Sequence, residues 1–150
     1  MITQKDLIIR LLFAFILGGL IGLERQIRNK HAGIRTHIIL CMASAFLVIS
    51  AIKFCTAFGT SEMGRIVLGV VISMGFLGAG VIYKEKEDQK VIIRGLTTSA
   101  TLLITAVIGM AVGMGYLFES VVTTVLVLIA LVLVRIIEIK TKLKSFKENK

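Results

Sequence analysis

Five long apolar stretches alternate with short polar or charged segments along the chain. The stretches cover residues 7–23, 34–54, 65–83, 96–116 and 120–139. Each is close to the roughly 20 residues that a helix needs to cross the hydrocarbon layer of a bilayer. The pattern therefore predicts an all-α fold class, a polytopic membrane helix bundle with about five transmembrane helices. One transmembrane domain over residues 1–139 and a basic tail over 140–150 make up the expected organisation.

Composition leads to the same class of protein. Hydrophobic residues make up 56% of the 150 positions, and the mean hydropathy is +0.92. A soluble domain of this length could not bury five such stretches, and the five helices leave no room for a soluble catalytic domain. We therefore expect the lipid bilayer to surround the protein.

The distribution of charge predicts an orientation. The formal net charge is +9, from 18 Lys and Arg residues against 9 Asp and Glu. A basic chain can indicate nucleic-acid binding, but anionic headgroups and basic cytoplasmic loops explain it more simply, so no nucleic-acid partner is expected. With five spans, the loops 24–37 and 84–94 and the C-terminal end share one side with 14 Lys and Arg residues, and the other side holds 4. This split predicts an N-terminus outside and a C-terminus in the cytoplasm.

Glycine spacing in the predicted spans indicates close helix packing, because small residues let the backbones of membrane helices approach each other. The predicted packing positions are Gly18, Gly22, Gly75, Gly78, Gly80, Gly95, Gly109 and Gly113. In the fourth span, Thr97, Thr101 and Thr105 continue the line of Gly109 and Gly113 at intervals of four residues. This ridge has two interpretations, of which hydrogen-bonded contact between helices is the commoner and the lining of a path for a solute is the other.

Charged residues gather at the ends of the predicted spans. Glu24 and Arg25 end the first span, and Arg35 begins the second. These three residues either form a buried ionic cluster at the cytoplasmic mouth of the bundle or belong to a basic loop that only sets the topology. Glu24 and Arg28 are four residues apart, in the favourable order for a helical ion pair. Arg94 stands where the chain re-enters apolar sequence.

Motifs of catalysis and metal binding are missing from the sequence. It contains no nucleophile–base pair, P-loop, CxxC or HExxH motif, so we expect no enzyme activity. His31 and His37 lie in a basic loop, where solvated or capping roles are commoner than metal ligation. No acidic residue lies near the middle of a span, although magnesium sites and ion carriers usually need such groups. Metal ligands are therefore left unassigned, and a channel of backbone carbonyls and threonines is not excluded.

Five short motifs, taken in order, resemble the signatures of the MgtC/SapB family. They are Gly22-Leu-Glu24-Arg25, Ala32-Gly33-Ile-Arg35-Thr36-His37, Gly75-Phe-Leu-Gly-Ala-Gly80, Gly95-Leu-Thr-Thr98 and Ala106-Val-Ile-Gly-Met110. The resemblance runs from about residue 7 to residue 116 and implies a multi-pass protein of the bacterial inner membrane. The functional cluster that it implies consists of Glu24, Arg25, Arg35, Thr36, Arg94, Thr97 and Thr98.

The family resemblance also implies a function. Members are associated with growth at low magnesium and survival in host phagocytes, and some resemble regulators that bind membrane partners, including the F-type ATP synthase. We therefore expect a homo-oligomeric, non-enzymatic protein that modulates another membrane protein at low magnesium. The alternative is a transporter or channel for magnesium or another ion. No cofactor is implied, and magnesium enters only as an ion that is transported or sensed.

Two features depart from the family pattern. Many members carry a tryptophan shortly after the Gly-Leu-Thr-Thr motif, where this chain has leucine, and the chain contains no Trp. The sequence also ends soon after the fifth predicted span, without the soluble C-terminal domain of the longer, virulence-associated members. The resemblance therefore does not extend to the role in virulence of those longer members.

Overall fold

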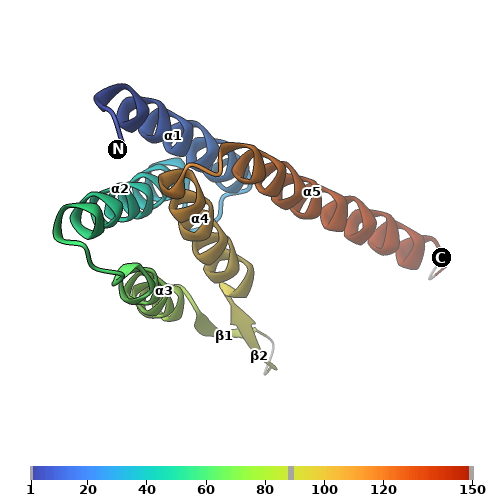
Figure 1. Cartoon of the computed structure of the whole chain (residues 1–150). Helices are drawn as coiled ribbons and strands as arrows, with labels where there is room; N and C mark the ends of the chain where they lie inside the picture. The colour runs from blue at the N-terminus through green and yellow to red at the C-terminus, as the bar shows by residue number, and fades with distance from the viewer. Residues whose placement is uncertain (1, 88–89, 149–150) are drawn as a thin grey trace.

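The computed structural model describes residues 2–87 and 90–148, and of residues 87, 90 and 134–148 it describes only the backbone. Within these residues the chain forms helices α1 (Gln4–Ile27), α2 (Ile34–Phe58), α3 (Met63–Gly80), α4 (Leu96–Met114) and α5 (Leu117–Glu148). Strands β1 (Tyr83–Glu87) and β2 (Lys90–Arg94) lie between α3 and α4. Figure 1 shows the hairpin of β1 and β2 beyond the first turn of α4, and α5 extending away from the other helices.

The helices confirm the predicted fold class. Among the described residues, α1 to α4 are each long and apolar enough to cross a membrane. The described apolar part of α5 runs from Leu117 to Leu133, so the side chains of the predicted fifth span beyond residue 133 lie outside the described residues. The backbone of α5 continues into the predicted basic tail as a helix as far as Glu148. The orientation in the membrane stays a prediction.

Some helix ends differ from the predicted spans because capping side chains or glycines determine where the helix begins or stops. Helix α1 begins before residue 7 because Thr3 and Asp6 form a capping box that satisfies the first backbone N–H groups. Helix α2 continues to Phe58 and stops where Gly59 adopts a left-handed conformation, with φ 64°. Helix α4 ends two residues before the predicted boundary, since Gly115 takes φ 100° and turns the chain into α5.

The third predicted span is wrong at its C-terminal end. Helix α3 stops at Gly80, and the segment expected to be a charged loop between helices forms an antiparallel pair of strands instead. Tyr83 pairs with Arg94 and Lys86 with Val91 in this register. The β-branched run of β2, together with the aromatic residue that starts β1, favours strands over a continued helix.

Helix α2 lies at the centre of the bundle, and α1 and α4 approach it through glycines. A Cβ atom added at Gly18 would lie 2.7 Å from the carbonyl oxygen of His37, and one added at Gly22 would lie 2.6 Å from the Ile34 Cα. On the other side, a Cβ at Gly113 would lie 2.6 Å from the Ala45 carbonyl oxygen. Gly109 meets the Cys41 carbonyl in the same way. The backbones of three helices therefore come into direct contact.

Helix α3 is set apart from α1 and α5 (Figure 1) and packs on α2 and α4 through a narrow stripe. Its buried residues are Val70, Met74 and Gly78. Gly78 faces the hydroxyl of Ser99, whereas Gly75 and Gly80 have no described atom near the position of an added Cβ. Gly75 and Gly80 were both predicted as packing positions, but neither makes a close contact within the described chain.

Candidate functional site

The first part of the candidate site is an ionic cluster at the C-terminal end of α1. Glu24 pairs through its two carboxylate oxygens with the Nε atoms of Arg25 and Arg28. The Arg25 side chain is 3% exposed and the Glu24 side chain 11%, so these charges are largely removed from water. Burial of a charge is costly unless it is paired, and the carboxylate between two guanidinium groups provides that pairing. The cluster can hold the end of α1 in one geometry.

The structure separates Arg35 from this cluster. Arg35 and Thr36 are exposed in the first turn of α2, and no ion pair joins Arg35 to Glu24 among the described residues. Both residues line a shallow cavity of about 410 Å³ together with Gln26. The Gln26 side-chain oxygen accepts a hydrogen bond of 3.3 Å from the Ile34 backbone N–H. The ionic cluster predicted from Glu24, Arg25 and Arg35 is therefore built with Arg28 in the place of Arg35.

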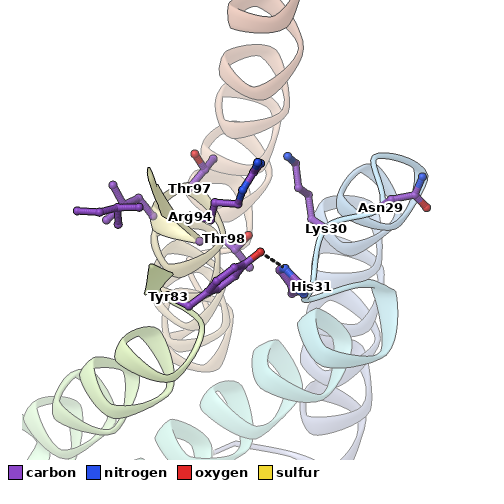
Figure 2. Close-up of a pocket in the computed structure, with 10 residues that line it drawn as sticks. Asn29, Lys30, His31, Tyr83, Arg94, Thr97 and Thr98 are labelled. Atoms are coloured by element: carbon purple, nitrogen blue, oxygen red, sulfur yellow. Dashed lines mark hydrogen bonds between the residues drawn. The ribbon is translucent and has the colours of Figure 1, made fainter. Parts of the chain in front are cut away.

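Arg94 lies in the second part of the candidate site, where the hairpin of β1 and β2 meets the loop between α1 and α2. Its guanidinium pairs with Glu85 across the two strands, and both side chains are about half exposed. Arg94 lines a cavity of about 430 Å³ with Thr97 and Thr98 from the start of α4 and with residues 29–31 of the loop. Figure 2 shows these side chains around the cavity.

A contact between His31 and Tyr83 joins the loop to the hairpin beside this cavity. The His31 Nε2 atom lies 2.8 Å from the Tyr83 hydroxyl, and the rings meet edge to face with centroids 5.3 Å apart (Figure 2). No partner of His31 was predicted, because the two residues are far apart in the chain and neither lies in a recognisable motif. Asn29, Lys30 and Tyr83 were likewise absent from the predicted cluster.

Two residues of the predicted threonine ridge of α4, Thr101 and Thr105, point into the protein, as does the neighbouring Thr98. Thr98 and Thr101 are 3% exposed, and Thr105 is fully buried. The Thr101 hydroxyl donates to the Thr98 carbonyl at 2.8 Å, and the Thr105 hydroxyl donates to the Thr101 carbonyl at 2.7 Å. Hydroxyls bonded to their own helix backbone in this way have their donors satisfied without a solute. Thr97 differs from them, since it is exposed at the second cavity.

Two further polar side chains form hydrogen bonds with backbone carbonyls. Arg10 donates a hydrogen bond of 2.6 Å to the Gly113 carbonyl at the end of α4, where helix carbonyls lack partners. His37 is fully buried between α1 and α2, and its Nδ1–H donates to the Gly33 carbonyl at 2.9 Å. Of the solvated and capping roles expected for His37, the solvated one is therefore wrong, because glycines on α1 bring that helix over the ring. Its Nε2 has no hydrogen-bond partner among the described residues.

The described residues contain no group of three or more His, Cys, Asp and Glu side chains that could hold a metal ion. What the arrangement offers is a buried ion cluster, a cavity with cationic residues in its lining, and helices packed through glycines. Together with four helices of spanning length, these features define a polytopic α-helical membrane protein.

The chain belongs to the MgtC family, since the sequence model of that family matches residues 11–140. It is 43% identical to YhiD of Escherichia coli K12 over 115 residues, which cover 73% of this chain and 52% of that protein. It is 40% identical to MgtC of Brucella abortus (81% of this chain, 48% of that protein) and 38% identical to MgtC of Salmonella typhimurium (85% and 52%). The chain therefore spans about half the length of these relatives. No solved structure matches it.

Proposed function

We propose that this chain is a protein of the bacterial inner membrane that adapts the cell to low magnesium by modulating another membrane protein, without catalytic activity of its own. Membership of the MgtC family supports this setting. The name of the relative YhiD, which presents it as a candidate magnesium transporter, connects one member with magnesium. The family resemblance makes the F-type ATP synthase the first partner to test.

The observation that carries the proposal is an uncovered face of α3, made by Gly69, Phe76 and Gly80. These residues are seven and four positions apart, so they lie along one side of the helix. Phe76 is 82% exposed, and no described atom lies within 4 Å of a Cβ added at Gly69 or Gly80. Glycines of a membrane helix allow another backbone to approach closely. The face is therefore suited to a helix of a second membrane protein.

The glycines of α1 and α4 provide the contrast. Gly18, Gly22, Gly109 and Gly113 are all in close contact with α2, so they serve the packing of this chain itself. The hydroxyls of Thr101 and Thr105 are bonded to the backbone of α4, so in this conformation they are not directed at a solute. Both findings favour a protein that acts through helix contacts over the transporter alternative.

Growth at low magnesium tests the α3 face. In a strain that depends on this chain, the double variant Gly69→Leu/Gly80→Leu is expected to lose growth support and to lose its partner on co-purification. Its level in the membrane should stay unchanged, because a Cβ at either position meets open space. Leu68→Phe adds bulk at another exposed position, about 100° around α3, and serves as the control that should retain function. Equal growth of the double variant and the control would contradict the proposal.

Reconstitution distinguishes the modulator from the transporter. Proteoliposomes that contain only the purified chain are expected to show no magnesium flux, since a modulator needs its partner. Saturable flux that disappears in Arg94→Ala would instead establish a transporter and overturn the proposed function. Circular dichroism of the same samples shows whether the reconstituted helices are folded.

A further inference from the structure

A cavity of about 430 Å³ lies where the loop between α1 and α2, the end of β2 and the start of α4 meet. We propose that this cavity is a binding site for the phosphate group of an anionic ligand. Its volume is several times the roughly 30 Å³ that one water molecule occupies in the liquid, so a phosphate group fits. The site does not depend on the proposed function, since it involves neither the α3 face nor a partner protein.

The charge of the cavity favours an anion. Among the described residues, its lining contains the two cations Lys30 and Arg94 and no carboxylate. Figure 2 shows the cationic ends of these two side chains directed toward each other across the site in this view. Glu85 lies outside the lining and offsets part of the charge of Arg94. Lys30 has no ion pair with a described residue, so its charge is available to a ligand.

Helix α4 adds backbone donors at the same place. Its N-cap is Gly95, with φ 94°, and no side chain caps this end through a hydrogen bond. Gly95 is tightly enclosed, since a Cβ there would collide with the Val81 carbonyl, and this contact fixes the direction in which α4 starts. The N–H groups in the first turn of a helix lack partners within the helix and carry the positive end of its dipole. Phosphate oxygens are common partners of such groups.

Thr98 supplies an independent indication of a ligand, since its unpartnered hydroxyl belongs to a side chain on the cavity lining. This residue is 3% exposed and lines the cavity, yet its hydroxyl has no hydrogen-bond partner among the described residues. In the described part of the chain, the two fully buried side-chain atoms without a partner belong to Glu24 and His37, so the Thr98 oxygen keeps accessible surface. The hydroxyl can donate to an oxygen of a bound phosphate. Thr97 presents a second hydroxyl at the same entrance.

The contact between His31 and Tyr83 keeps the two halves of the site together. It joins the loop that carries Lys30 to the strand pair that carries Arg94, with 2.8 Å between the His31 Nε2 atom and the Tyr83 hydroxyl. The cavity lies between ends of helices that span a membrane. Both a lipid headgroup and a soluble phosphate compound can reach such a position, and both present the same phosphate chemistry.

Binding measurements on the full chain in phosphatidylcholine nanodiscs test this site. The soluble arm measures the binding of radiolabelled pyrophosphate by equilibrium dialysis. The lipid arm adds phosphatidic acid to the nanodiscs and measures the retained lipid by native mass spectrometry. We expect at least one probe to bind, and Lys30→Gln and Thr98→Val each to weaken binding about tenfold through the loss of a hydrogen bond to a charged group. Lys53→Gln, at the other end of α2, removes the same charge and should change binding less than about twofold.

Each outcome decides the proposal. Binding of pyrophosphate alone identifies a soluble ligand, and binding of phosphatidic acid alone identifies a headgroup, provided that the site variants weaken it. Absence of binding of both probes to the folded chain overturns the proposal, as does equal binding by wild type, Lys30→Gln and Thr98→Val. Circular dichroism establishes folding, and if Thr98→Val fails to fold, Lys30→Gln decides the result, because Lys30 is exposed on a loop.

Discussion

The contact between α1 and α2 makes a quantitative prediction for the substitution Gly22→Ala. An added methyl group would lie 2.6 Å from the Ile34 Cα and 3.0 Å from both the Gly33 carbonyl oxygen and the His37 Cβ. Carbon atoms in favourable contact are about 3.5–4.0 Å apart. Two of the three neighbours are backbone atoms, which cannot rotate away. The two helices must therefore separate locally, and overpacking of this kind costs about 1–3 kcal/mol.

Gly69→Ala is the matched control, because no described atom lies within 4 Å of the added methyl group. Both positions are inside apolar helices, so the gain in helix propensity from glycine to alanine, about 1 kcal/mol, is common to both variants. The difference between them isolates the steric cost. Gly22→Ala is expected to lower the free energy of unfolding by about 1–3 kcal/mol relative to Gly69→Ala.

Far-UV circular dichroism during unfolding by SDS in mixed micelles measures this difference. It reports on the helices directly, which suits a chain that contains no Trp. Equal stability of the two variants, or greater stability of Gly22→Ala, would refute the conclusion that the α1–α2 backbone contact is tight. Gly113→Ala, which meets the Ala45 carbonyl, should behave like Gly22→Ala.

Three further predictions concern charge. Glu24→Gln leaves the buried Arg25 without its carboxylate and is expected to cost about 3 kcal/mol of unfolding free energy, part of which Glu24→Gln/Arg25→Met should recover in the same unfolding assay. Arg10→Met removes the hydrogen bond to the Gly113 carbonyl and should cost about 1–3 kcal/mol, with a smaller loss in Arg10→Lys; equal stability of Arg10→Met and wild type would contradict the role of this bond. Alkaline phosphatase fused in the loop between α2 and α3 should be active and in the hairpin inactive, since the hairpin is predicted to be cytoplasmic, and the reverse pattern would overturn the predicted orientation.

The candidate site was predictable in part. The pair of Glu24 and Arg28 followed from a spacing of four residues on one helix, which places their side chains on the same face. The 430 Å³ cavity had no comparable signal, because Lys30 and Thr98 are distant in the chain and neither lies in a motif that specifies the other. Of its lining residues, Arg94, Thr97 and Thr98 were predicted through the family resemblance, and Gly95 was predicted as a packing position.

Glycine patterns show the same limit. The spacing of Gly18 with Gly22 and of Gly109 with Gly113 was equal to that of Gly75 with a small residue at position 79. The first two pairs contact α2, whereas a Cβ added at Gly75 would meet no described atom outside its own helix backbone. A spacing of four shows that a helix has a face of small residues, but it does not show whether another helix of the same chain covers that face.

The sequence by itself determined the class of the protein and the approximate positions of its helices. In a bilayer each spanning segment must satisfy its own backbone hydrogen bonds, so the length and hydropathy of a local stretch are sufficient to identify it. The tertiary structure decided that Arg28 rather than Arg35 pairs with Glu24, that His31 contacts Tyr83, and that a pair of strands precedes α4. These partners depend on the rotation and separation of segments far apart in the chain, which are set by packing between helices and not by any local pattern.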